Sequence, residues 1–340
     1  LTRENNQAAG KTWVYTYDNG GNILSKSEYA YTTGALGTAL DTISYGYGDS
    51  TWKDLLTSYD GQALTTDAIG NLTNDGTWSY TWQHGRQLAQ MSRPDASGDT
   101  EMIRFRYDSS GHRIGKDSGV YHASYSGGEI VYAGETTRTS YSYLGDTLTQ
   151  VRIVEPNSSA TLHFTYDEIG PMSVTYDGAE YFYLKNAQGD VTGLVNSSGT
   201  QVVAYTYDAW GNPLTTTGTM ADTLGKLNPF RYRGYVYDTE TGLYYLQSRY
   251  YNPETGRFIN ADSYALTGQG VLSGNMFAYV LNNPLSYSDH SGNFALTIGT
   301  AIVLLASAAL AYLTAKAITS PKVRKDVAKA ANYVYNKVRE

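Results

Sequence analysis

Aromatic and hydroxyl-bearing residues alternate in short runs along much of the chain. The run Tyr-Thr-Tyr occurs at residues 15–17 and again at 205–207. Residues two apart in a β-strand point to the same face, so each run predicts a strand with rings on one face and threonine on the other. Aromatic and β-branched residues also favour strands. The alternation therefore predicts aromatic ladders across neighbouring strands.

Most of these runs end in Asp or Asn, with Gly three residues later. The repeated Asp or Asn residues are Asp18, Asp67, Asp108, Asp167, Asn186, Asn196 and Asp208. Such a side chain can accept hydrogen bonds from the backbone just after it, and Gly supplies the positive φ of a tight turn. A single hairpin is not stable alone. We therefore predict an all-β fold of stacked antiparallel hairpins over residues 1 to about 290.

The pattern changes at Phe294. Residues 294–315 carry no charge and are rich in Ala, Leu and Ile. As a helix they would extend about 33 Å, which is enough to cross a bilayer, although a helix buried in protein fits the same composition. After Pro321, apolar residues recur at helical spacing opposite a basic face. This pattern predicts an amphipathic helix that either contacts an anionic membrane or presents an ordinary solvated face.

Composition narrows the possible functions. The 340 residues include 33 Tyr, 35 Gly and no Cys, and the net charge is −7. Disulfide scaffolds and cysteine-bound metal sites are excluded, and the acidic balance argues against a nucleic-acid partner. The five histidines lack metal-ligand spacing, and no motif indicates a cofactor. Because Leu1 lies in what reads as a polar loop with no start signal, we expect a C-terminal piece of a longer protein.

One segment is specific enough to indicate a family. The run that carries it is Pro229, Phe230, Arg231, Tyr232, Arg233, Gly234, Tyr235, then Gly242, Leu243, Tyr244, Tyr245, then Arg249, Tyr250, Tyr251, and finally Asn282, Asn283, Pro284. It resembles the core-associated domain of Rhs and YD-repeat proteins, and the upstream repeat resembles their YD repeat. The resemblance divides the chain into YD repeats (1–227), a core segment (228–293) and a helical tail (294–340).

The resemblance implies a function. In this family YD repeats wind as a spiral β-shell, the core segment closes one end, and the sequence after it is often a toxin held inside. By that analogy the chain is the closing part of a secreted or surface-delivered shell. Its partners would be its own C-terminal segment and further repeats on its N-terminal side. The tail would reach a membrane if it inserts there.

In self-cleaving relatives two aspartates of the core segment act as an aspartyl protease. Asp262 and Asp289 hold the matching places, and the scissile bond would join Asn293 and Phe294. Two close carboxylates that share a proton supply an acid and a base together. The prolines that usually follow both aspartates are missing here, so a purely structural turn at Asp289 is the alternative.

The tyrosines leave a further alternative open. Large amphipathic rings usually form cores, but a tyrosine-lined surface could also stack on sugars. The second functional hypothesis is therefore a cell-surface adhesion protein that binds carbohydrate and is anchored by its tail. The self-cleaving peptidase is the third.

Overall fold

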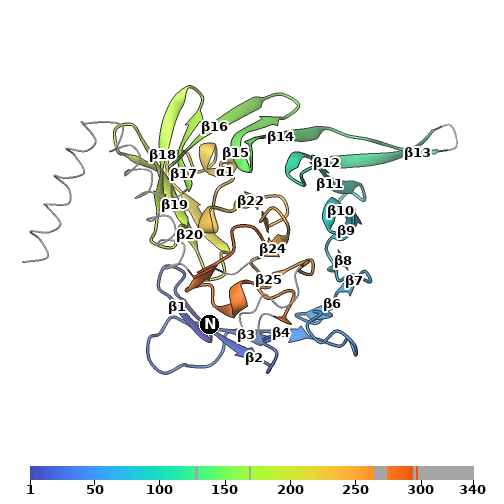
Figure 1. The fold of residues 1–340 in the computed structure, drawn as a ribbon, viewed down its shortest axis with the longest axis vertical. Coiled ribbons are helices and arrows are strands. Elements are labelled where there is room, and N and C mark those ends of the chain that lie inside the picture. The colour runs from blue at the N-terminus through green and yellow to red at the C-terminus, as the bar shows by residue number, and fades with distance from the viewer. Residues whose placement is uncertain (127–128, 168–169, 264–273, 294–295, 298–340) are drawn as a thin grey trace, which may run out of the picture.

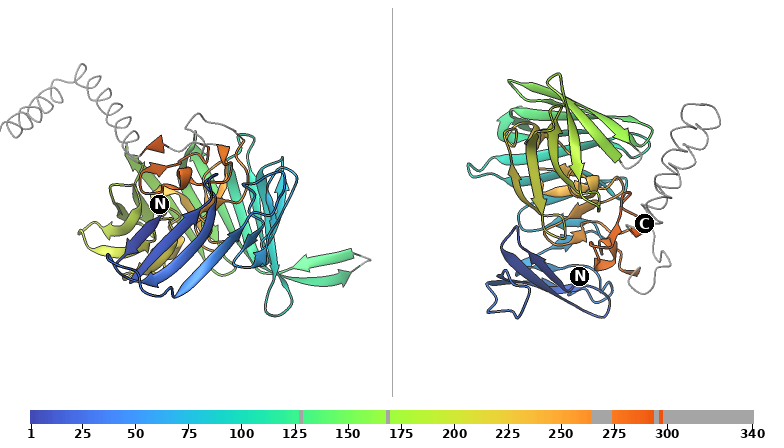
Figure 2. Two further views of the ribbon diagram at one scale, coloured as in Figure 1. Left: turned by 90° about the horizontal axis from the view of Figure 1, so that it is seen from below. Right: turned by 90° about the vertical axis from the view of Figure 1, so that its left-hand side faces the viewer.

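The computed structural model describes residues 1–126, 129–167, 170–263, 274–293 and 296–297. Within them nearly all regular structure is antiparallel sheet, which confirms the predicted all-β class. Strands β1 to β21 form a curved wall that surrounds the core segment (Figure 1). The two further views show the same wall from its side (Figure 2).

The wall consists of two sheets. The first has six strands in chain order: β1 (Arg3–Asn6), β2 (Lys11–Tyr17), β3 (Ile23–Ala30), β4 (Asp41–Gly46), β5 (Ser58–Tyr59) and β6 (Gln62–Ala63). The second has fifteen: β7 (Thr65–Thr66), β8 (Leu72–Asn74), β9 (Ser79–Gln83), β10 (Gln87–Pro94), β11 (Thr100–Tyr107), β12 (Arg113–Ser126), β13 (Glu129–Ala133), β14 (Thr136–Leu144), β15 (Thr147–Val154), β16 (Ser159–Asp167), β17 (Gly170–Tyr176), β18 (Ala179–Lys185), β19 (Val191–Asn196), β20 (Gln201–Tyr207) and β21 (Pro213–Thr217). Only β13 leaves the path, as the partner of the long β12 in an arm that projects from the wall (Figure 1).

The core segment follows the short helix α1 (Leu224–Leu227). Its elements are η1 (Tyr232–Gly234), β22 (Val236–Asp238), β23 (Leu243–Tyr245), β24 (Tyr250–Asn252), β25 (Arg257–Phe258), η3 (Val280–Asn282) and β26 (Tyr287–Ser288). Strands β22 to β25 form a separate small sheet inside the wall (Figure 1). Strand β27 (Leu296–Thr297) pairs with β26.

The repeat turns have the predicted geometry. At Asp18 one carboxylate oxygen accepts the amides of Gly20 and Asn22, both at 2.8 Å, and Gly21 has φ of 80°. The Asn22 side chain donates to the other carboxylate oxygen at 2.9 Å. A further turn of this kind, at Asp95 and Asp99, was not predicted as part of the repeat.

The rings lie on the inner face, as the alternation predicts. Tyr15 and Tyr205 are buried, whereas Thr16 and Thr206 bond to hydroxyls of neighbouring strands on the outer face. The second tyrosine of a run often reaches back to a backbone carbonyl just after an earlier turn. Examples are Tyr47 to Ile23 at 3.0 Å, Tyr107 to Leu88 at 3.0 Å and Tyr207 to Val191 at 2.8 Å. Each such bond ties one hairpin to another.

The core segment packs against the inner face of the wall in three hydrophobic clusters. Phe230 packs among the rings of Phe164, Tyr166 and Tyr183. A second cluster joins Trp13, Tyr15 and Tyr45 of the wall to the core tyrosines, and a third joins β8 to β11 to Tyr245, Tyr250 and Ile259. The tyrosine excess is therefore largely a packing feature.

The structure describes two residues of the predicted helical tail. A helix was expected from Phe294 onward, but Leu296 and Thr297 form strand β27. The open edge of β26 offers backbone hydrogen bonds to this segment, and Thr fits a strand better than a helix. The remainder of the predicted apolar and basic helices, residues 298–340, lies outside the described residues. None of the helices in the described ranges is long and apolar enough to cross a bilayer.

Candidate functional site

Asp262 and Asp289 lie on either side of one arginine. Asp262 follows β25, Asp289 follows β26, and Arg249 directly precedes β24. The Arg249 Nη2 atom is 2.8 Å from Asp262 Oδ2 and 3.5 Å from Asp289 Oδ2. Asp262 is 7% exposed and Asp289 is 2% exposed. The core segment thus brings the two aspartates named from the sequence around a single buried cation.

Arg249 holds several parts of the core segment together. Its Nη1 donates to the Met276 carbonyl at 3.0 Å, its Nε donates to the Gly292 carbonyl, and its guanidinium lies 3.6 Å from the Phe258 ring centre. Burial lowers the pKa of Arg249 to about 10, although the charges of Asp262 and Asp289 act in the opposite direction. The group is therefore still cationic at neutral pH.

Asp289 also organises the last turn of the core segment. Its Oδ1 accepts the backbone amides of Gly292 at 2.8 Å, Asn293 at 3.1 Å and Ser291 at 3.2 Å. Its own amide donates to the Tyr235 hydroxyl at 2.8 Å. Gly292 has φ of 75°, and a Cβ there would lie 2.7 Å from the Leu246 carbonyl oxygen, so the turn requires glycine.

This geometry has a consequence for proton transfer. An aspartyl pair works when one carboxyl is protonated and the other ionised. A guanidinium between two carboxylates favours the charged form of both. In the described arrangement Asp262 and Asp289 form an ion triad with Arg249, so a protease-like pair here would work beside a buried guanidinium.

Asn293, on the predicted N-terminal side of the cut, lines a cavity of about 300 Å³. The same cavity is lined by Arg86 and His112 from turns of the β-wall and by Ser248 of the core segment. The end of the core segment therefore lies against these turns. Phe294 lies outside the described residues. Arg249 belongs to the run that indicates the family, but no role could be predicted for it from the sequence. Its partners Asp262 and Asp289 lie well away from it along the chain.

A second ion cluster fixes the core segment to the wall. Arg113 and Lys116 of β12 both pair with Asp238 of β22, Lys116 at 3.0 Å, and Lys116 also reaches Glu240 at 2.7 Å. Burial alone would raise the pKa of Asp238, but the two cations outweigh it and hold the pKa below its ordinary value. Asp238 is therefore ionised across the neutral range.

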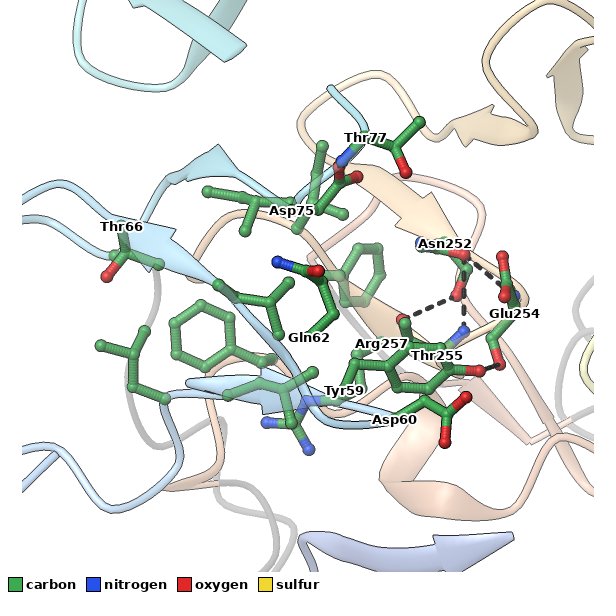
Figure 3. Close-up of a pocket in the computed structure, with 18 residues that line it drawn as sticks. Tyr59, Asp60, Gln62, Thr66, Asp75, Thr77, Asn252, Glu254, Thr255 and Arg257 are labelled. Atoms are coloured by element: carbon green, nitrogen blue, oxygen red, sulfur yellow. Dashed lines mark hydrogen bonds between the residues drawn. The ribbon is translucent and has the colours of Figure 1, made fainter. Parts of the chain in front are cut away.

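A further cavity beside the core segment lies between β5 to β8 and β24 to β25 (Figure 3). Its volume is about 290 Å³. Apolar and aromatic groups share its lining with the carboxylates of Asp60, Asp75 and Glu254, and with the guanidinium of Arg257. Arg257 is 2% exposed, and its Nη1 has no acceptor among the residues that the structure describes.

The described part of the chain holds no group of three or more His, Asp or Glu side chains placed to bind a metal.

Comparison with known proteins shows the relationships of the chain. The family model for the teneurin YD-shell matches residues 1–284. The tRNA3(Ser)-specific nuclease WapA of Bacillus spizizenii is 36% identical over 240 residues, covering 70% of this chain and 9% of the relative. The toxin protein Tse5 of Pseudomonas aeruginosa is 24% identical over 340 residues, covering 84% of this chain and 24% of the relative.

Solved structures show the same fold. The crystal structure of TcdB2-TccC3-Cdc42 aligns with a TM-score of 0.64 at 19% identity, covering 87% of this chain and 14% of that one. The chain spans about a tenth of the length of the WapA proteins that it matches.

The triad can be tested by removing its cation. Arg249→Met would leave two buried carboxylates beside each other, and loss of one partner from a buried ion pair typically costs about 3 to 5 kcal/mol. We expect the free energy of unfolding in urea to fall by this amount at pH 7.5. Arg138→Met removes an exposed ion pair with Asp117 and should change stability by less than about 1 kcal/mol. Equal losses in the two variants would contradict the triad.

Proposed function

The chain belongs to the teneurin YD-shell family, and we propose that it closes one end of a β-shell that encloses a C-terminal effector segment of the same polypeptide. The observation that carries this proposal is the core segment filling the inside of the wall, with rings from both parts interlocked. The relatives named as nucleases and toxins support an effector role for the whole protein. The protein is then secreted or delivered to other cells.

The proposal assigns distinct roles to the three parts of the chain. The wall supplies the shell, with further repeats as its neighbours on the N-terminal side. The core segment seals it, and the residues after Asn293 are the start of the enclosed segment. Contact of the tail with a membrane is part of the same proposal. It is motivated by the uncharged run 294–315 and the seven basic residues between Lys316 and Glu340.

A protease-protection experiment tests the enclosure. The basic residues of the tail are trypsin sites, so in the full-length protein we expect them to be cut at least tenfold more slowly than in a peptide of residues 316–340. Gly211→Ala should remove much of this protection, because its Cβ would lie 2.6 Å from the Tyr232 ring and displace the core segment.

Gly199→Ala is the matched control for that variant. Gly199 has φ of 81° against 93° for Gly211, but nothing lies within 4 Å of its Cβ position. Both variants carry the backbone strain of alanine at positive φ, and only one disturbs the contact with the core segment. Tail cleavage at the same rate as in the free peptide would refute enclosure.

We also propose that Asp262 and Asp289 cleave the Asn293–Phe294 bond. One carboxyl, once protonated, would polarise the Asn293 carbonyl, while the other takes a proton from the attacking water, and the amine of Phe294 leaves with a proton. The bond between the Asn293 amide and Asp289 Oδ1 supports this assignment by placing the carboxylate next to the predicted cut.

Intact-mass measurement tests self-cleavage. In the wild type the fragment ending at Asn293 should accumulate, and the measurement is made at pH 5 and at pH 7.5. Asp262→Asn and Asp289→Asn should each abolish it, and Asp117→Asn should not. A single species of full mass at both pH values would leave Asp289 with only its structural role.

Saccharide binding is a second candidate function, and the cavity in Figure 3 favours it. Of the tyrosines with described burial, Tyr31 is the exposed one, so a tyrosine surface offers little area for stacking. The cavity instead combines carboxylate acceptors, the guanidinium donor of Arg257 and aromatic walls. A neutral polyhydroxyl ligand both donates and accepts hydrogen bonds, and its apolar faces suit such walls.

A glycan array probed with the purified protein tests this second function. Binding should fall at least fivefold in Glu254→Gln and in Asp60→Asn, both of which alter exposed carboxylates of the cavity. Asp177→Asn is the control. Asp177, like Asp60, is an exposed turn residue with positive φ, but it is distant from the cavity, so this variant should leave glycan binding unchanged. Absence of any bound glycan, or equal binding by all variants, would exclude the cavity as a saccharide site.

A further inference from the structure

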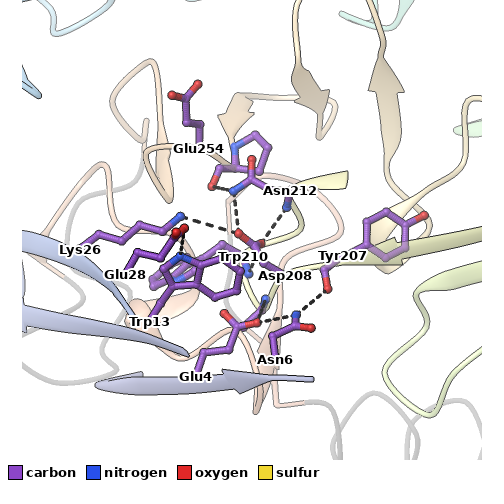
Figure 4. A network of polar contacts seen from close by, with 12 residues as sticks. Glu4, Asn6, Trp13, Lys26, Glu28, Tyr207, Asp208, Trp210, Asn212 and Glu254 are labelled. Carbon is purple, nitrogen blue, oxygen red and sulfur yellow. Dashed lines mark hydrogen bonds and ion pairs between the residues drawn. The ribbon is translucent and has the colours of Figure 1, made fainter. Parts of the chain in front are cut away.

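The wall closes on itself where its first strands meet the turn after β20 (Figure 4). We call this contact the seam and define it by Glu4 and Asn6 of β1, Lys26 of β3, and residues 207–210. Glu4 Oε1 accepts the Ala209 amide at 2.9 Å and the Asn6 side-chain amide at 3.0 Å. The same Asn6 nitrogen donates to the Tyr207 carbonyl at 3.2 Å. Glu4 is thus the residue through which β1 holds the far end of the wall.

Only one oxygen of the Glu4 carboxylate is used in these bonds. The other, Oε2, is buried and has no donor among the residues that the structure describes. A buried carboxylate oxygen without a donor is unfavourable when the group is charged. Protonation of that oxygen removes the charge and turns it into a hydroxyl donor.

A second carboxylate faces Glu4 across the seam. Asp208 is 4% exposed, and its Oδ1 accepts the amides of Trp210 at 2.9 Å and Asn212 at 2.8 Å. The cation present is Lys26, whose Nζ is 3.8 Å from Asp208 Oδ2. Tyr15 of β2 also faces the pair, as do Tyr59, Tyr232 and Tyr251 on the Asp208 side, and burial raises the pKa of each of these tyrosines above the neutral range.

The charges at the seam do not balance. Two carboxylates and one ammonium share a buried site, which leaves an excess negative charge when both acids are ionised. Burial, and then the charge of Asp208, raise the pKa of Glu4 to about 7. Burial also raises the pKa of Asp208, although Lys26 and Asn212 oppose the shift.

We propose that the seam is a proton-controlled latch: uptake of one proton by the Glu4 and Asp208 carboxylates tightens the contact between β1 and the end of the wall. The sign follows from linkage. The pKa of Glu4 is 4.5 in the unfolded chain and is raised to about 7 on folding. Such a group stabilises the folded state fully below pH 4.5, and this contribution is lost as the pH rises through about 7. The seam therefore holds most firmly in mildly acidic solution and loosens toward pH 8.

Hydrogen exchange of the Ala209 amide in the intact chain measures the latch. This amide donates to Glu4, so it reports opening of the seam directly. After correction for the intrinsic exchange rate, we expect its protection to be about tenfold greater at pH 5.5 than at pH 8.0. Equal protection, or greater protection at pH 8.0, would overturn the proposal.

Three variants separate the latch from general pH effects. Glu4→Gln should remove the pH dependence of Ala209 protection. Glu28→Gln, on the same strand as Lys26 but bound to Lys11 and Trp13, should retain it. Lys26→Met should move the midpoint of the pH dependence of Ala209 protection to higher pH, because the cation that favours ionised carboxylates is gone. An unchanged midpoint in Lys26→Met, or the wild-type pH dependence in Glu4→Gln, would refute the latch.

Discussion

The structure depends on covering the inner, aromatic face of the wall. Each hairpin is too small to bury its own rings, and stacking hairpins side by side leaves one whole face of the sheet exposed. The core segment covers that face. Phe230 makes edge-to-face contacts with Phe164 at 4.9 Å and Tyr183 at 6.1 Å between ring centres. Wall and core segment therefore stabilise each other, and neither has a complete hydrophobic core alone.

Aromatic packing by itself does not choose one position for the core segment, because rings tolerate many arrangements. Buried charge is more selective. Asp238 has its two cations, Arg113 and Lys116, only when β22 lies beside β12, and any other register leaves a charge buried without a partner. Arg257 adds a second tie, donating to the Asp54 carbonyl at 2.7 Å. These polar contacts give the interior a single register.

Local features of the fold could be predicted, and long-range ones could not. The turn at Asp18 depends on residues within four positions, so its geometry followed from the sequence. The turn at Asp95 was missed because no pair of aromatic residues precedes it. The role of Arg249 depends on how the core segment folds back, which brings Asp262 and Asp289 to one guanidinium. The strand at Leu296 and Thr297 was missed for the same reason, since its partner β26 had to be in place first.

The position of the nearest cation distinguishes the two pairs of buried acids. Arg249 is within ion-pair distance of both Asp262 and Asp289, so the pair that resembles a protease dyad shares one buried guanidinium. Lys26 is within ion-pair distance of Asp208, and the donors to Glu4 among the described residues are the neutral amides of Ala209 and Asn6, so the pair without any catalytic motif is the one that takes up a proton near neutrality. Self-cleavage would thus take place beside the Arg249 guanidinium, whereas closure of the wall responds to pH through Glu4 and Asp208.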